Sequence, residues 1–152
     1  MKSILTFLVL MLFTITASGQ QTNPKYDSIL AKKLGADEYG MKRFILVILK
    51  TGSNETTDKL FIDSCFTGHM KNIGRMVEQG QLIVAGPIAK NENSYRGIFI
   101  LNVKDMDEAK EILLSDPAIK ENLLEPDLYY WYGSAALPEY LETSYKIRKM
   151  NP

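Results

Sequence analysis

The sequence holds one histidine, His69, within a segment whose apolar residues are spaced as in a helix. Imidazole has an ordinary pKa of about 6.5, so it exchanges protons near neutral pH more readily than other side chains. A histidine at this point lies on or beside the apolar side of the helix. His69 is therefore a candidate general base or acid, and a packed residue at the border of the core is the alternative.

Asp116 is the second candidate, in the stretch Ser-Asp-Pro near the end of a later predicted helix. A carboxylate that holds one nitrogen of an imidazole fixes its tautomer and leaves the other nitrogen available as base or acid. The alternative is that Asp116 only hydrogen-bonds the turn that this tripeptide favours. In a layer of two helices side by side, Asp116 and His69 can meet, so both interpretations stay open.

Three further residues are candidates for substrate binding. Gly86 and Pro87 end a short apolar segment, where a tight bend either shapes the wall of a pocket or simply terminates a strand. Trp131 belongs to the aromatic cluster 129–132, for which packing in the core or in a dimer interface is the alternative role.

The sequence predicts neither a metal site nor a bound cofactor. One histidine and one cysteine, with no carboxylate at ligand spacing from either, make a poor coordination set. A glycine-rich phosphate loop is also missing from the sequence. The single cysteine, Cys65, permits no internal disulfide and is interpreted as a small buried residue.

The predicted helix around His69 contains two glycines, Gly68 and Gly74. Each costs a helix interior up to about 1 kcal/mol relative to alanine. A glycine allows a neighbouring backbone or a ligand to come close, because it carries no Cβ atom. Both glycines therefore predict a close approach on this part of the helix.

Six elements are expected to position these residues. Strands are predicted over 42–52, 81–87, 97–103 and 124–133, and helices over 58–79 and 105–123. The first helix has one apolar stripe that includes Met70 or His69, and it ends at Gly80. The order β-α-β-β-α-β is that of a ferredoxin-like α+β fold.

The predicted strands are apolar on both faces, as in the runs 45–49 and 98–101. Two helices cover only one face of a four-stranded sheet. The other face would be too large an apolar patch for a monomer. The sequence therefore predicts a homodimer in which two sheets pack together.

The two ends of the chain lie outside this domain. Residues 1–19 combine Lys2, an apolar run and small residues, the pattern of a secretory signal peptide. The run is shorter than the roughly 20 residues of a membrane-spanning helix, and an uncleaved anchor is the alternative. Residues 20–41 are interpreted as a leader, 42–137 as the domain and 138–152 as a C-terminal helix or tail. The expected location is periplasmic or secreted, with no membrane contact after cleavage.

The charge balance gives no indication of a nucleic-acid partner. The chain has 18 Lys and Arg against 18 Asp and Glu, and the expected cleavage after Gly19 or Gln20 removes only Lys2 from these. Nucleic-acid-binding domains and proteins that bind anionic membranes carry a basic excess instead. The expected partners are therefore a small molecule and a second copy of the chain.

The stretches HMKNIGRMVEQGQLIVAGPIA and RGIFILNVKDMDEAKEILLSDPAIK, in this order and at this separation, resemble the YciI-like (YCII-related) family. The shared pattern is a histidine in the first helix, Gly-Pro closing the second strand and Asp-Pro closing the second helix. The resemblance covers about 42–131. It implies a dimeric α+β barrel of ferredoxin-like subunits, with an active site around a histidine–aspartate pair that falls on His69 and Asp116.

The resemblance also implies proton transfer on small cyclic or carbonyl compounds, in a lyase or isomerase type of reaction. The chain departs from the family in its export signal and in the tail after Trp131, which could cover a pocket or reinforce the dimer. A small-ligand-binding module without catalysis, using the same pocket, is the alternative function. Haem binding, known among some dimeric α+β barrels, is a more distant one.

Overall fold

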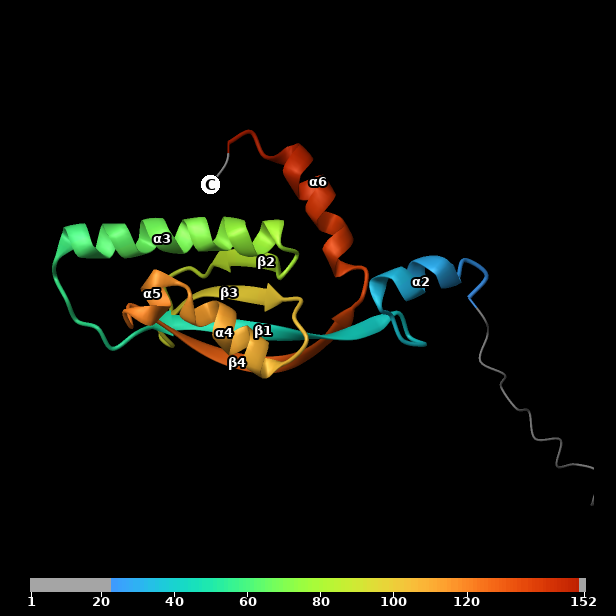
Figure 1. Cartoon of the computed structure of the whole chain (residues 1–152), viewed down its shortest axis with the longest axis horizontal. Helices are drawn as coiled ribbons and strands as arrows, with labels where there is room; N and C mark the ends of the chain where they lie inside the picture. Colours follow the sequence, from blue (N-terminus) through green and yellow to red (C-terminus); the bar gives the residue numbers. More distant parts are fainter. Residues whose placement is uncertain (1–22, 151–152) are drawn as a thin grey trace, which may run out of the picture.

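The computed structural model describes residues 23–150, and the predicted signal peptide lies outside this range. The strands and helices of the domain follow the order β-α-β-β-α-β, which confirms the ferredoxin-like α+β prediction (Figure 1). In chain order, the elements are α2 (Ser28–Leu34), β1 (Met41–Thr51), α3 (Lys59–Glu78), β2 (Leu82–Pro87), β3 (Tyr95–Leu101), α4 (Met106–Leu114), α5 (Pro117–Lys120), β4 (Leu124–Ser134), the 3-10 helix η1 (Leu137–Glu139) and α6 (Tyr140–Ile147).

The four strands form one antiparallel sheet in the order β2-β3-β1-β4. Because successive side chains of a strand point to opposite faces, β1 sends Ile45, Val47 and Leu49 to the side of the helices. These side chains form the core with residues of β3 and with α3, α4 and α5. Figure 1 shows α3 running along this side of the sheet. None of the helices described is long and apolar enough to cross a membrane.

The other face of the sheet is also apolar. Phe44 of β1 is fully buried there and packs on Trp131 of β4, with 5.7 Å between the ring centroids. The aliphatic side chains of this face are only partly buried, and they are Leu46, Ile48, Val84, Ile98 and Ile100. The strand register places Lys42, Asp127 and the exposed Tyr129 on the same face.

The segment predicted as one helix over 105–123 is two helices, α4 and α5, that meet at Asp116. Pro117 is the first residue of α5, where its missing N–H costs nothing. The residue before a proline is pushed out of the helical conformation, and Asp116 has an extended backbone with ψ of 120°. The chain therefore turns at Asp116 and aims α5 across α3.

The two ends of the described chain are tied to the sheet. Upstream of β1, the Tyr132 hydroxyl donates a hydrogen bond to Asp37, which follows α2. Downstream, the Tyr140 hydroxyl at the start of α6 donates to the backbone oxygen of Ile83 in β2, at 2.7 Å. This second bond holds α6 beside the edge of the sheet that β2 forms.

Candidate active site

His69 and Asp116 meet in the layer of helices. His69 lies in the middle of α3 and is 8% exposed, and Asp116 is fully buried at the start of α5. Nδ1 of His69 lies 2.8 Å from Oδ2 of Asp116. Because an ionised carboxylate only accepts hydrogen bonds, this contact assigns the ring proton to Nδ1. The other ring nitrogen, Nε2, makes no hydrogen bond with residues 23–150.

Each oxygen of Asp116 has its own function. Oδ1 accepts hydrogen bonds from the backbone N–H groups of Ala118 at 3.0 Å and Ile119 at 3.4 Å, and so caps α5. Oδ2 accepts from His69 and from the Asn72 side-chain amide at 3.1 Å. The sequence left two alternatives open for Asp116, a turn residue and a partner of the histidine. The structure shows that Asp116 is both.

The surroundings of Asp116 lower its pKa below the ordinary value. Burial is the largest influence and by itself would raise the pKa, because it disfavours the charged form. The hydrogen bond and the charge of His69 act in the opposite direction, and so do the hydrogen bonds from Asn72 and the Ile119 backbone. Together these interactions outweigh the effect of burial on the pKa. Asp116 is therefore ionised at neutral pH and accepts hydrogen bonds from all four donors.

Asn72 extends the pair into a network that the sequence interpretation missed. Its Oδ1 accepts from Arg75 at 2.6 Å, while its amide donates to Asp116. Arg75 also donates to Ser115 at 3.0 Å. A signal for Asn72 was present in the sequence, because it lies three residues after His69 and thus on the same side of the helix. A poor helix former at a buried helical position indicates a polar partner.

Gly68 allows the pair to form. A Cβ atom at Gly68 would lie 2.7 Å from Cγ of Pro117, which is closer than carbon atoms pack. The missing side chain therefore lets α5 approach α3 and brings Asp116 to His69. At Gly74 a Cβ atom would meet nothing within 4 Å, so the close approach of a protein segment is confirmed for Gly68, whereas no described residue comes close to Gly74.

This difference makes the two glycines a matched pair of test sites. Gly68→Ala is expected to lower the free energy of unfolding by about 1–3 kcal/mol, because α5 must move away from α3. Gly74→Ala is expected to raise it by up to about 1 kcal/mol, because alanine is the better helix former. Urea unfolding of both variants measures these changes. A stabilising Gly68→Ala substitution would contradict the described packing of α5 on α3.

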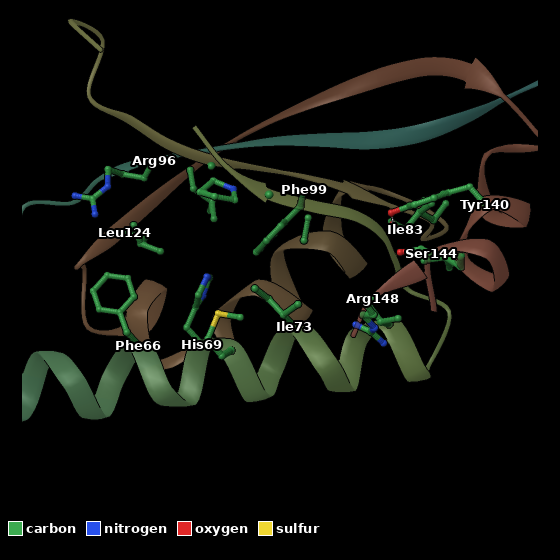
Figure 2. Close-up of a pocket in the computed structure, with 18 of the residues that line it drawn as sticks. Phe66, His69, Ile73, Ile83, Arg96, Phe99, Leu124, Tyr140, Ser144 and Arg148 are labelled. Carbon is green, nitrogen blue, oxygen red and sulfur yellow. Dashed lines mark hydrogen bonds between the residues drawn. The ribbon is translucent and has the colours of Figure 1, made fainter. Parts of the chain in front are cut away.

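A cavity of about 520 Å³ opens beside His69, between α3, the sheet and α6. Figure 2 shows His69 pointing from α3 into this cavity, with Phe66 and Ile73 of the same helix on either side. The imidazole stacks on Phe99 of β3, with 5.9 Å between the ring centroids, and meets Phe66 edge to face. The volume is typical of small-molecule sites, which are also largely apolar.

Of the three residues predicted to bind substrate, two line the cavity and one does not. Gly86 and Pro87, at the end of β2, line the cavity. Trp131 lies away from it, on the opposite face of the sheet against Phe44. Trp131 faces away from the cavity because it pairs with Phe44 across the sheet, and both side chains point to the same face. The next residue of β1, Ile45, points to the opposite face, where the helices lie.

The C-terminal helix forms one end of the cavity. The lining residues from this segment are Tyr140, Leu141, Ser144, Tyr145 and Arg148. Arg96 of β3 lies at the opposite end, as Figure 2 shows. The tail after Trp131 was expected to cover a pocket or reinforce the dimer. Neither arginine was predicted, because no local pattern shows which distant segments line a cavity with them.

The described part of the chain contains no group of three His, Cys, Asp or Glu side chains placed to hold a metal ion. Cys65 is buried in α3, and burial raises the pKa of its thiol above the ordinary value. A raised pKa disfavours the reactive thiolate.

No protein-family model matches the sequence, and no curated protein matches it. Among solved structures, the chain is similar to 5-chloro-2-hydroxyhydroquinone dehydrochlorinase from Burkholderia phenoliruptrix AC1100, in a complex with 2,5-dihydroxybenzoquinone. The two share 16% sequence identity and superpose with a TM-score of 0.44. The match covers 57% of this chain and 92% of the other.

Proposed function

We propose that His69 acts as general base and then general acid on a small molecule in the cavity, with Asp116 as the residue that orients it. The observation that carries this proposal is the hydrogen bond of 2.8 Å between buried Asp116 and Nδ1 of His69 at the cavity wall. It leaves Nε2 as the nitrogen that accepts a proton from the substrate. The chain would then be an exported YciI-like protein, with residues 1–19 removed.

The chemistry is proton transfer of the lyase or isomerase type. Nε2 of His69 removes a proton from a carbon next to a carbonyl group. The electron pair of the broken C–H bond forms a double bond to the carbonyl carbon, and the π pair of the C=O bond moves onto the oxygen to give an enolate. In an isomerisation the proton returns from Nε2 to another atom. In an elimination a leaving group departs from the neighbouring carbon with its bonding electrons. Neither course needs a redox partner.

A small-ligand-binding module without catalysis is the second candidate, and one observation favours it. Asp116 caps α5 through Oδ1, a structural function that would hold the carboxylate in place in a protein without catalysis. A buried carboxylate also needs donors in either case, so the hydrogen bond to His69 satisfies it without any reaction.

Solvent exchange separates the two candidates. The wild-type protein would be incubated in D₂O with a panel of small cyclic ketones, lactones and carbonyl acids, and loss of C–H signals would be followed by proton NMR. The acid–base proposal expects exchange of at least one compound well above the rate in buffer. Compounds that bind, as seen by shifts of the His69 ring signals, without any exchange would instead support the binding module.

We also propose that the chain forms a homodimer through the second face of its sheet. Support comes from the partly buried apolar side chains Leu46, Ile48, Ile98 and Ile100, which lie on the face opposite the core helices. Surfaces of this kind are rare on monomers. The same arrangement would make the dimeric α+β barrel that the sequence resemblance implies.

Ile100→Glu tests this dimer, because it buries an unpaired charge at the centre of the face. The charge is expected to cost about 3 kcal/mol or more, which weakens association at least about 100-fold. Leu60→Glu is the matched control, since Leu60 of α3 is 83% exposed. Sedimentation should give a dimer for wild type and Leu60→Glu and a monomer for Ile100→Glu. A monomeric wild type would contradict the proposal.

A further inference from the structure

We propose that the cavity takes a small apolar molecule with one carboxylate, and that Arg148 of the C-terminal segment binds this carboxylate. The inference rests on the proposed function, because it names the class of compound that the same cavity holds. Three observations carry it: the charges of the lining, the absence of competing partners for Arg148, and the place of Arg148 relative to His69.

The charged side chains of the lining have one sign. Arg96 and Arg148 line the cavity, and none of its lining residues within the described chain is Asp, Glu or Lys. Because the rest of the lining is mostly aliphatic and aromatic, the site combines an apolar body with two guanidinium groups at its ends. A cationic ligand would be repelled there, and a neutral one would leave the guanidinium groups unused.

The guanidinium of Arg148 is available to a ligand. None of the ion pairs found among residues 23–150 includes Arg148. It lies over the ring of Tyr145, 4.3 Å from the ring centroid, which restrains its orientation. Arg75, by contrast, already donates to Asn72, Gln79 and Ser115.

The place of Arg148 fits a carboxylate better than a phosphate. Ser144 lies four residues earlier in α6 and lines the same end of the cavity, as Figure 2 shows. One guanidinium and one hydroxyl match the two oxygens of a carboxylate, whereas a phosphate dianion usually collects more donors. His69 lies between the two arginines along the cavity, so a carboxylate at Arg148 would direct the body of the molecule towards the imidazole.

Two probes of equal shape test the inference, 2-naphthoate and its neutral counterpart 2-naphthamide. Binding would be followed through the ring signals of His69, which are unambiguous because the chain has one histidine. Wild type is expected to bind naphthoate up to about fivefold more tightly than naphthamide, which corresponds to about 1 kcal/mol, because Arg148 is exposed and water screens its charge. Arg148→Gln should remove this preference and change naphthamide binding by less than about twofold.

Arg43→Gln is the matched control, because Arg43 also lies over a tyrosine ring, 4.9 Å from that of Tyr130, but outside the cavity. It should leave both affinities unchanged, and Arg148→Lys should retain part of the preference. Equal wild-type affinities for the two probes would overturn the inference, and so would a preference lost in Arg96→Gln but kept in Arg148→Gln.

The same probes separate this inference from the proposed function. A preference for naphthoate in a protein that exchanges no C–H protons would support the carboxylate site and overturn the acid–base proposal. Exchange activity combined with equal affinities for the two probes would support the acid–base proposal and overturn the carboxylate site. Failure of both probes to bind would overturn the carboxylate site together with the assignment of this cavity as a ligand site.

Discussion

Asp116→Ala is expected to lower the free energy of unfolding by about 3–5 kcal/mol, because it removes the acceptor from a buried charged network. The two backbone N–H groups at the start of α5 lose their cap, which alone costs about 1 kcal/mol. His69 Nδ1 and the Asn72 amide then remain buried without their acceptor, each at a cost of about 1–2 kcal/mol. Urea unfolding at pH 7 measures the sum.

The effect of Asp116→Ala should depend on pH, with a defined sign. The pKa of Asp116 is lowered in the folded protein, so the folded state binds its proton less readily than the unfolded chain does. Its stabilising contribution is therefore complete above the unfolded pKa of about 3.9 and is lost as the pH falls through the folded value. The difference in stability between wild type and Asp116→Ala should shrink below about pH 4.

Asp105→Ala is the matched control for this experiment. Asp105 caps α4 by accepting from the Glu108 backbone N–H at 3.0 Å, but it has no histidine partner. Its loss should cost only about 1 kcal/mol. Equal losses for Asp105→Ala and Asp116→Ala would contradict the buried network, and a difference that grows in acid would contradict the lowered pKa.

His69→Asn is expected to reduce proton transfer about 10²–10⁴-fold for any compound that the wild type exchanges with solvent, because general acid–base catalysis contributes on that scale. Asparagine keeps a side-chain donor near Asp116, so the fold should persist while the base is lost. Exchange rates in D₂O, normalised to folded protein by the melting transition, measure the effect.

Met70→Leu is the control for His69→Asn. Met70 also lines the cavity, is adjacent in α3 and cannot transfer a proton. This change nearly conserves the volume of the side chain, so exchange should stay within a fewfold of wild type. If His69→Asn and Met70→Leu lower exchange by the same factor, His69 acts on the shape of the cavity and not as a base.

The order of elements followed from local patterns, whereas the pairing of His69 with Asp116 was implied by the family resemblance. Strand alternation and helical spacing are properties of short segments, so the β-α-β-β-α-β order was accessible from the sequence. Asp116 was singled out because Ser-Asp-Pro is typical of a helix end, but the start of a second helix at Pro117 was not predicted. The sequence left open whether Met70 or His69 belongs to the apolar stripe of α3. The structure shows that it is His69, because His69 is buried and Met70 is exposed.

Other parts of the site depend on how distant segments pack. Alternation placed Trp131 and Tyr129 on one face of β4, but nothing local says which face carries the helices. Arg148 reaches the cavity because α6 returns to the edge of the sheet, where Tyr140 binds the backbone of Ile83. Contacts of this kind join residues far apart in sequence, and no spacing rule predicts them.

The tautomer of His69 tests the central claim most directly. With one histidine in the chain, two-dimensional ¹H–¹⁵N NMR of the imidazole gives one set of ring signals, and the two nitrogen shifts identify which nitrogen carries the proton when the ring is neutral. The hydrogen bond to Asp116 predicts a proton on Nδ1 and a bare Nε2 facing the cavity. A proton on Nε2 would contradict the account, because the ring would then present no base to a substrate.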